Sequence, residues 1–236
     1  MDTSPRCWSS SEKTSSRSQG AVLELTPRHA VPVFPLPDLV LFPHTVAALH
    51  VYELRYRAMV RDALDGERLI VMALLQPGWE LDYHGSPQYF PIGCLARVQA
   101  VEWLPNDCYD LKLAGVSRVR FAPTSREYPY RAARVTLLPQ EPLPESDPLV
   151  DMERLALTEM FLRFAAEMGT PVTLRDEMPL EPLVNHVCLS LGLEPADKLR
   201  LLELDSVLDR SRQTREWMAR RAARPAPPSQ GEGERN

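Results

Sequence analysis

The chain of 236 residues has few of the residues that mark several common protein classes. Its four cysteines, Cys7, Cys94, Cys108 and Cys188, are widely spaced and form no C-x-x-C pair, which argues against a zinc knuckle and a dense disulfide framework. No run approaches the roughly 18 apolar residues that a membrane span needs, and residues 1–20 contain no apolar core of a signal peptide. We therefore expect a cytoplasmic protein with reduced thiols and no membrane partner.

The motifs of ATP hydrolysis and of proteolysis are also missing. The sequence has no G-x-x-x-x-G-K-[ST], and no glycine is followed by lysine, so the phosphate-binding loop is absent. The three lysines, Lys13, Lys112 and Lys198, lie in no serine-bearing context that would support a Ser-Lys dyad. The histidines show no H-E-x-x-H spacing, which favours structural or surface roles over a metal site. We expect no enzyme activity, no cofactor and no metal; the enzyme alternative is a hydrolase with an undetected site.

The first half of the chain has the pattern of a β-domain. Four prolines between residues 31 and 43 restrict the backbone there to short extended segments. Residues 46–51 are interpreted as a buried strand. Residues 56–64 carry apolar side chains at i, i+3, i+4, i+7 and i+8, which predicts an amphipathic helix. A continuous apolar run and alternating segments predict the further strands, with a bulge or bend at Gly115. These strands are expected at residues 69–75, 90–103, 109–121 and 130–138.

The second half has the pattern of a helical bundle. After a proline-rich acidic connector, the period of the apolar residues changes from two to 3.6. The last helix, over residues 206–223, is predicted to be the longest and the most basic. Met152, Met160 and Met168 could line an adaptable groove, although their helical spacing favours packing in the core. The predicted division is a disordered leader (1–28), a β-domain (29–139), a linker (140–148), a helical bundle (149–224) and a disordered tail (225–236).

The order of several motifs resembles that of the Lon protease N-terminal, substrate-binding domain. These motifs are P-L-P-D-L-V-L-F-P from Pro35, A-L-H-V-Y-E-L-R-Y-R from Ala48, I-G-C-L-A-R-V, L-A-G-V-S-R-V-R-F and K-L-R-L-L-E-L-D-S-V-L-D-R. A glycine commonly follows the second proline in that family, and His44 stands there in this chain. The resemblance covers residues 31–221 and identifies a stand-alone domain of this type. It implies an α+β fold in which a PUA-like, mostly antiparallel pseudobarrel of six to eight strands precedes a four-helix bundle.

The resemblance implies binding in place of catalysis: recognition of unfolded or tagged polypeptides, as an adaptor or accessory to an ATP-dependent protease. Aromatic residues around the loop 76–90 and apolar residues at the first turn could together form a surface for exposed hydrophobic segments. An equally good interpretation is that several of them only cap the barrel. The candidate client-binding residues are Leu41, Phe42, His44, Trp79, Tyr83, Tyr89 and Phe90.

RNA binding by the arginine-rich last helix is a further alternative, because PUA-like folds include RNA binders. The net charge of −5 and the lack of interleaved aromatic residues other than Trp217 count against it, and a solvated helix face explains the arginines as well. Nucleic acid is therefore not the expected partner, and the sequence does not fix the oligomeric state. The arginines concerned are Arg210, Arg212, Arg215, Arg220, Arg221 and Arg224.

Overall fold

The computed structural model describes residues 27, 29–83, 85–124, 129–144, 146–172, 174–175 and 178–223. Apart from Pro27, the predicted leader lies outside the described residues, and so does the whole of the predicted tail. Arg224 also lies outside them. The division of the chain into five parts therefore stays a prediction.

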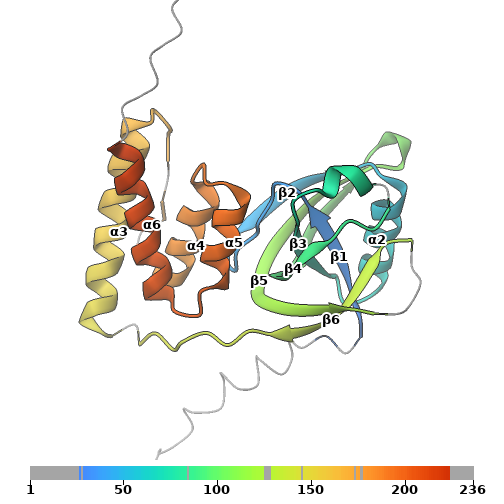
Figure 1. Ribbon diagram of the computed structural model, residues 1–236, viewed down its shortest axis with the longest axis horizontal. Coiled ribbons are helices and arrows are strands. Elements are labelled where there is room, and N and C mark those ends of the chain that lie inside the picture. The colour runs from blue at the N-terminus through green and yellow to red at the C-terminus, as the bar shows by residue number, and fades with distance from the viewer. Residues whose placement is uncertain are drawn as a thin grey trace, which may run out of the picture.

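The strands form one sheet that closes on itself (Figure 1). Their order is β2-β5-β4-β3-β1-β6, and an additional pairing of β5 with β6 closes five strands into a barrel, to which β2 adds at the side of β5. Among these strands β1 and β3 run parallel and the other pairs are antiparallel, which confirms the predicted mostly antiparallel barrel. The strands are β1 (Val31–Leu36), β2 (Val46–Val51), β3 (Leu69–Leu75), β4 (Tyr89–Trp103), β5 (Tyr109–Pro123) and β6 (Arg131–Leu137).

Strand β3 pairs with β1 on one side and β4 on the other, and all seven of its residues are buried, as the continuous apolar run predicts. The long strands β4 and β5 bend where their register shifts, once opposite Gly115. A Cβ atom at Gly115 would lie 2.0 Å from the carbonyl oxygen of Phe42, so only glycine allows the chain to approach so closely there. The bend predicted at Gly115 is present.

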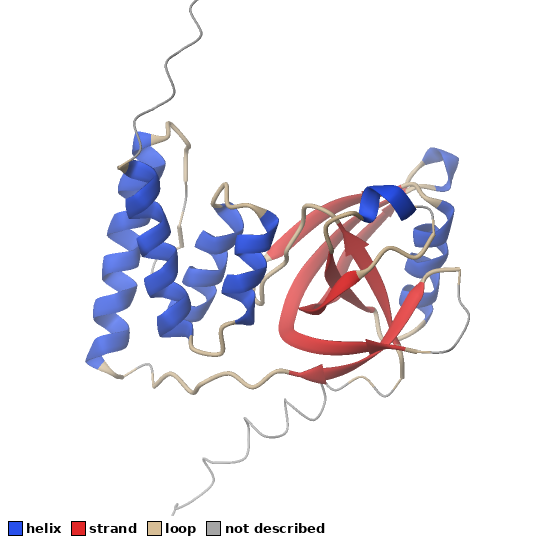
Figure 2. Cartoon of the chain, in the orientation of Figure 1, coloured by secondary structure: helices blue, strands red, loops and turns tan. Residues whose placement is uncertain are grey.

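The helices occupy two places (Figure 2). Helix α2 (Leu54–Asp65) packs Tyr56, Met59, Val60 and Ala63 into the barrel core, and the 3-10 turns η1 (Trp79–Asp82) and η2 (Pro105–Asp107) lie between strands. The bundle consists of α3 (Pro148–Glu167), α4 (Leu180–Ser190), α5 (Pro195–Glu203) and α6 (Val207–Ala222). Helix α3 has 20 residues and α6 has 16, so the prediction that the last helix is the longest is wrong.

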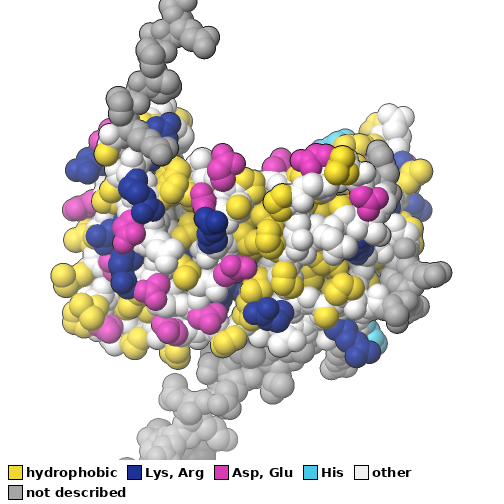
Figure 3. Space-filling model, in the orientation of Figure 1, with side chains coloured by type: hydrophobic (Ala, Val, Ile, Leu, Met, Phe, Trp, Pro, Cys, Tyr) yellow, Lys and Arg dark blue, Asp and Glu magenta, His cyan; other side chains and the backbone are white. Residues whose placement is uncertain are grey.

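One side of α3 is exposed, although it is apolar. Met152 is 66% exposed and Met168 is 47% exposed, so the prediction that they pack in the core is wrong for these two, whereas Met160 is partly buried. Helix α3 contacts α4 and α6 on one side, and hydrophobic side chains lie along its outer edge (Figure 3). Helix α3 therefore has two apolar sides, and the rest of the bundle covers only one of them.

Apolar packing joins the barrel to the bundle. Val40, Phe42 and Leu74 come from the barrel side of the chain, and they belong to the same buried cluster as Leu183, Val184 and other residues of the bundle. Phe42 is fully buried in that cluster. The barrel and the bundle therefore share part of one core.

Two buried arginines add a polar layer to this junction. Arg118 on β5 donates to the carbonyl oxygens of Leu202 (3.0 Å) and Pro139 (2.5 Å), and to the carboxylate of Asp205 (2.7 Å). Arg210 on α6 is fully buried and donates to the carbonyl oxygens of Leu201 (2.9 Å) and Leu204 (2.7 Å).

A buried amide extends this polar layer to the first turn of the barrel. Arg210 also donates to Oδ1 of Asn185 at 2.8 Å, and Asn185 donates to the carbonyl oxygen of Pro43 at 3.1 Å. Burial, and to a smaller extent the charge of Arg118, lower the pKa of Arg210 to about 10, so Arg210 is still charged at neutral pH. The turn between α5 and α6 is thus held from both sides by guanidinium groups.

We expect Arg210→Met to lower the free energy of unfolding by about 3 kcal/mol, because it leaves buried oxygen acceptors without a donor. Urea unfolding followed by circular dichroism measures the change. Arg200→Met is the matched control: Arg200 is exposed and pairs with Asp197 one turn away, so its removal should change stability by less than about 1 kcal/mol. Equal, small losses in both variants would contradict the structural role of Arg210.

Candidate functional site

The structure distributes the seven predicted client-binding residues over separate places. Leu41, Phe42 and Tyr89 are buried, each in a different hydrophobic cluster. Phe90 is partly buried against the bundle. Their part in client binding stays a prediction, and the solvent-facing area available to it comes mainly from the remaining three residues.

Trp79 and Tyr83 lie together in the loop between β3 and β4. Their rings meet edge to face with centroids 5.4 Å apart. The hydroxyl of Tyr83 donates to Oε1 of Glu53 (2.5 Å), and Arg55 donates to the carbonyl oxygen of Tyr83 (3.1 Å), which ties the loop to the start of α2. Burial and the bond to Glu53 raise the pKa of Tyr83 to about 12. Both interpretations of the loop fit this arrangement, because a tied loop can still present Leu81, which is 95% exposed.

His44 lies where the barrel meets the bundle. Its φ of 62° is in the left-handed region that glycine adopts most easily, so replacing the usual glycine does not prevent this turn. Nε2 of His44 is 3.6 Å from Oε2 of Glu181 on α4, and Gln140 donates to the same oxygen at 2.5 Å. The neighbouring carboxylate of Glu181 raises the pKa of His44. Burial alone would raise the pKa of Glu181, but the neighbouring His44 and the hydrogen bond from Gln140 lower it overall.

Strand β2 has an accessible surface that was not predicted from the sequence. The prediction that residues 46–51 form a buried strand is wrong, because Val46, Ala48 and His50 are exposed and alternate with residues that face the core. Among the described strands β2 pairs with β5 alone, so its other edge is unpaired. The strand is half-buried and lies at the edge of the sheet.

The hydrogen bonds near Thr45 show which residues of β2 face the free edge. Gly115 donates to the carbonyl oxygen of Thr45 (2.8 Å), and Thr45 lies opposite Gly115 in the register of β2 and β5. In an antiparallel pair, the backbone N–H and C=O groups of successive residues point alternately toward and away from the partner strand. Residues 47, 49 and 51, like Thr45, therefore direct these groups toward β5. The N–H and C=O groups of Val46, Ala48 and His50 therefore point away from the sheet.

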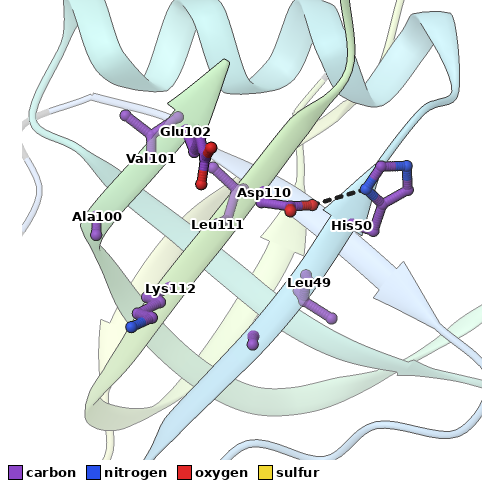
Figure 4. Close-up of a pocket in the computed structure, with 9 residues that line it drawn as sticks. Leu49, His50, Ala100, Val101, Glu102, Asp110, Leu111 and Lys112 are labelled. Atoms are coloured by element: carbon purple, nitrogen blue, oxygen red, sulfur yellow. Dashed lines mark hydrogen bonds and ion pairs between the residues drawn. The ribbon is translucent and has the colours of Figure 1, made fainter. Parts of the chain in front are cut away.

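A shallow pocket of about 560 Å³ lies on the outer surface of β2, β5 and β4 (Figure 4). Register places His50, Asp110 and Glu102 in one row across the three strands, and Ala48, Lys112 and Ala100 in the next. Nδ1 of His50 is 2.7 Å from Oδ1 of Asp110. The pocket is lined by Ala48, Leu49, His50, Ala100, Val101, Glu102, Asp110, Leu111 and Lys112. We call this surface, with the free edge of β2, the β2 face.

Two large apolar side chains lie exposed on the same face. Tyr52 directly after β2 is 63% exposed, and Val46 at its start is 50% exposed. Trp103 at the end of β4 is also exposed, but its register with the buried Tyr109 and Val51 places it on the other side of the sheet. The rings of His50 and Tyr52 stack with centroids 6.2 Å apart. The β2 face thus combines carboxylates, apolar side chains and an unpaired backbone edge.

The described residues that line the pocket include no nucleophile. The pocket holds a His–Asp pair, but none of its lining residues is a serine, threonine or cysteine that the pair could activate. Cys94 and Cys188 are buried, and burial raises their thiol pKa to about 12 and about 11. In the part of the chain that the structure describes, no group of three or more His, Cys, Asp or Glu residues could hold a metal ion. None of the described helices is long and apolar enough to cross a membrane.

The fold defines the class of the protein first: it is an α+β module in which a closed, mostly antiparallel barrel is joined to a helical bundle. The N-terminal domain of a Mycobacterium avium complex Lon protease superposes with a TM-score of 0.59 at 20% identity, over 81% of this chain and 98% of that one. A Lon N-terminal domain protein from Xanthomonas campestris gives a TM-score of 0.58 at 22% identity, over 80% and 99%.

The sequence then assigns the family. The model of the ATP-dependent protease La (LON) substrate-binding domain matches residues 30–220, and the chain belongs to this family. The chain is 31% identical over 186 residues to the Lon protease of Koribacter versatilis, and 29% identical over 194 residues to Lon protease 2 of Herpetosiphon aurantiacus. These alignments cover 75% and 77% of this chain, but 22% and 23% of the two relatives, so the match is to a fraction of their length.

We expect the pKa of His44 to lie above 6.5, and Glu181→Gln to lower it. Because the folded-state pKa is raised, this residue stabilises the fold fully below pH 6.5, and the contribution is lost as the pH rises through the raised pKa. Glu181, whose pKa is lowered, contributes above about pH 4.5, and that contribution is lost as the pH falls through the lowered pKa. NMR titration of the histidine ring protons tests this. His186, whose pKa burial lowers, is an internal control that should not respond to Glu181→Gln.

Proposed function

We propose that this chain is a non-catalytic module that binds extended segments of unfolded or tagged polypeptides along the β2 face. The observation that carries the proposal is the unpaired edge of β2, which lies beside exposed apolar side chains. Membership of a substrate-binding domain family supports a role in holding substrate polypeptides. We assign that role to the β2 face.

The edge of β2 suits an extended backbone. Val46, Ala48 and His50 each direct one N–H and one C=O group away from the sheet, and a strand-like peptide can pair with all of them. Such pairing uses the peptide backbone and depends little on sequence, which fits the binding of many clients. Alternate side chains of the added strand would then lie over the pocket.

The side chains of the β2 face favour a particular composition of client. Tyr52 and Val46 offer apolar area for hydrophobic residues that are exposed only in unfolded chains. Glu102 forms no ion pair with any residue that the structure describes, and Asp110 lies between it and His50. We infer a preference for extended segments in which apolar residues alternate with lysine or arginine.

The proposed client-binding module acts as an adaptor or accessory to a separate ATP-dependent protease. Its match to the model of a substrate-binding domain supports this assignment, in which the module holds clients while the partner supplies unfolding and cleavage.

The arrangement of α6 gives little support to RNA binding. Arg210 is buried, and Arg212, Arg215 and Arg220 pair with Asp209, Glu153 and Glu216. A helix face whose arginines are matched by acids has a weak positive potential and offers few free cations to phosphates. The polypeptide proposal is therefore preferred.

Ala48→Pro should reduce client binding about tenfold or more with little loss of stability, because it removes an outward N–H while the bonds to β5 remain. Ala48→Ser is the matched control, since it keeps the N–H and should bind as the wild type does. Fluorescence anisotropy with labelled, reduced and carboxymethylated lactalbumin measures binding, and a labelled RNA oligomer is titrated in parallel. Equal binding by both variants would rule out strand addition at β2. Salt-sensitive binding to RNA alone would overturn the proposed function.

Two aromatic residues distinguish the β2 face from the loop predicted from the sequence. Tyr52→Ala should weaken binding to the same polypeptide several-fold without lowering the melting temperature, since Tyr52 is largely exposed. Trp79→Ala should lower the melting temperature, because Trp79 is packed against Tyr83 and the barrel, and should leave binding by the folded protein nearly unchanged. The reverse result, with binding lost in Trp79→Ala and kept in Tyr52→Ala, would assign clients to the loop.

A further inference from the structure

The exposed side of α3 carries a heptad pattern that is separate from its core-facing side. Val150, Leu157, Phe161 and Ala165 face the bundle. A second set of residues recurs at spacings of three and four on the outer side, and every member is exposed. This second set, which we call the α3 seam, consists of Met152, Leu155, Glu159, Leu162 and Ala166.

We propose that the α3 seam binds one amphipathic helix of a partner protein, with a lysine or arginine of that helix facing Glu159. This surface is distinct from the β2 face, so the inference goes beyond the proposed function. The seam extends over two heptads, or about 21 Å at the rise of an α-helix. An a/d seam of this kind accepts the a and d side chains of a second helix between its own.

The charges along α3 show what the partner helix must supply. Arg154 pairs with Asp151, and Arg163 with Glu167, both within α3. Glu159 lies between Leu155 and Leu162 on the seam and forms no ion pair with any described residue. A helix that covered the apolar neighbours would remove water from this carboxylate, and a cation on the helix would compensate for that loss.

A hollow beside the seam gives the partner helix a second point of contact. A pocket of about 250 Å³ lies between α3 and α4 and has Leu162 of the seam in its wall. Leu174, Met178 and Leu183 supply apolar wall beside Arg154, Thr158 and Arg175, and Met178 can adapt its shape to an inserted side chain. The partner helix can therefore place a side chain in contact with the protein beyond α3 itself.

A second copy of this chain fits the seam less well. Parallel pairing of two α3 helices would place Glu159 opposite its own counterpart, and like charges in a seam oppose association. Antiparallel pairing about the middle of α3 would place Glu159 opposite Leu155 and leave its charge without a partner. Five side chains on one helix also offer less area than the roughly 800 Å² per partner of a standard stable interface.

The position of α3 allows both surfaces to be used at once. Helix α3 forms the outer edge of the bundle, whereas the barrel lies at the other side of α4 and α5 (Figure 1). A partner helix on the seam would therefore leave the β2 face open to a client. A bound partner protein and a held client can thus occupy the same molecule.

A charge-swap experiment tests the proposal. The probes are two labelled 21-residue synthetic helices with leucine and isoleucine at a and d, one with lysine and one with glutamate at the seam position facing Glu159. Both are confirmed as monomers by sedimentation before use. The wild-type protein should bind the lysine peptide about tenfold more tightly than the glutamate peptide, and Glu159→Lys should reverse this preference.

Two further variants separate docking at the seam from non-specific adhesion. Leu155→Asp should abolish binding of both peptides while the melting temperature stays near that of the wild type, because Leu155 is 60% exposed. Leu81→Asp changes an exposed leucine outside α3 in the same way and should bind as the wild type does.

The proposal is overturned if the peptides bind without preference for the charge at position 159. It is also overturned if Leu155→Asp dissociates a dimer seen in the wild type, since a second copy would then cover the seam. Lactalbumin binding measured on the same variants reports the proposed function separately, and loss of that binding would leave the α3 result unaffected.

Discussion

The burial of Arg118 and Arg210 is the constraint on which the relative placement of barrel and bundle depends. Removing a guanidinium group from water is costly, and the cost is offset only when its donors reach acceptors in good geometry. Here the acceptors are backbone carbonyls of the turn between α5 and α6, the connector and the first turn of the barrel through Asn185. Apolar contacts such as those of Phe42 would tolerate many small displacements, but this set of hydrogen bonds is satisfied by one arrangement.

Much of the fold could be predicted from local patterns. The apolar run of β3, the glycine at position 115 and the change of period after the connector each follow from forces that act over a few residues. The role of Arg118 could not be predicted in the same way, although the position fits the family pattern. Its acceptors Leu202 and Asp205 lie 84 and 87 residues further along the chain, and backbone carbonyls carry no side-chain signature. An arginine whose partners are distant backbone carbonyls forms no sequence motif of fixed spacing, so its role cannot be recognised from the sequence.

The candidate surfaces were harder to predict than the core, and for a definite reason. In β2 the alternation of exposed and buried positions is masked, because valine and alanine occupy exposed positions that usually hold polar residues. In α3 both sides carry apolar residues, so Met152 on the outer side and Leu157 on the inner side fit one helical pattern equally well. Sequence periodicity identifies which residues are apolar, and only tertiary packing decides which of them the rest of the chain covers. The aromatic loop illustrates the reverse case, since Tyr89 is aromatic and lies near a turn but is held in the core beside Phe121.

The closure of the barrel has a consequence for synthesis of the chain. Val31 at the start of β1 pairs with Ala133 in β6, and the carbonyl of Leu202 is needed by Arg118 on β5. A ribosome must therefore complete most of the domain before the barrel can close, and contacts between distant residues form slowly. Until then β1 presents an unpaired edge, and the strands present apolar faces to their surroundings. A nascent copy of this protein chemically resembles the extended segments that we propose as its clients.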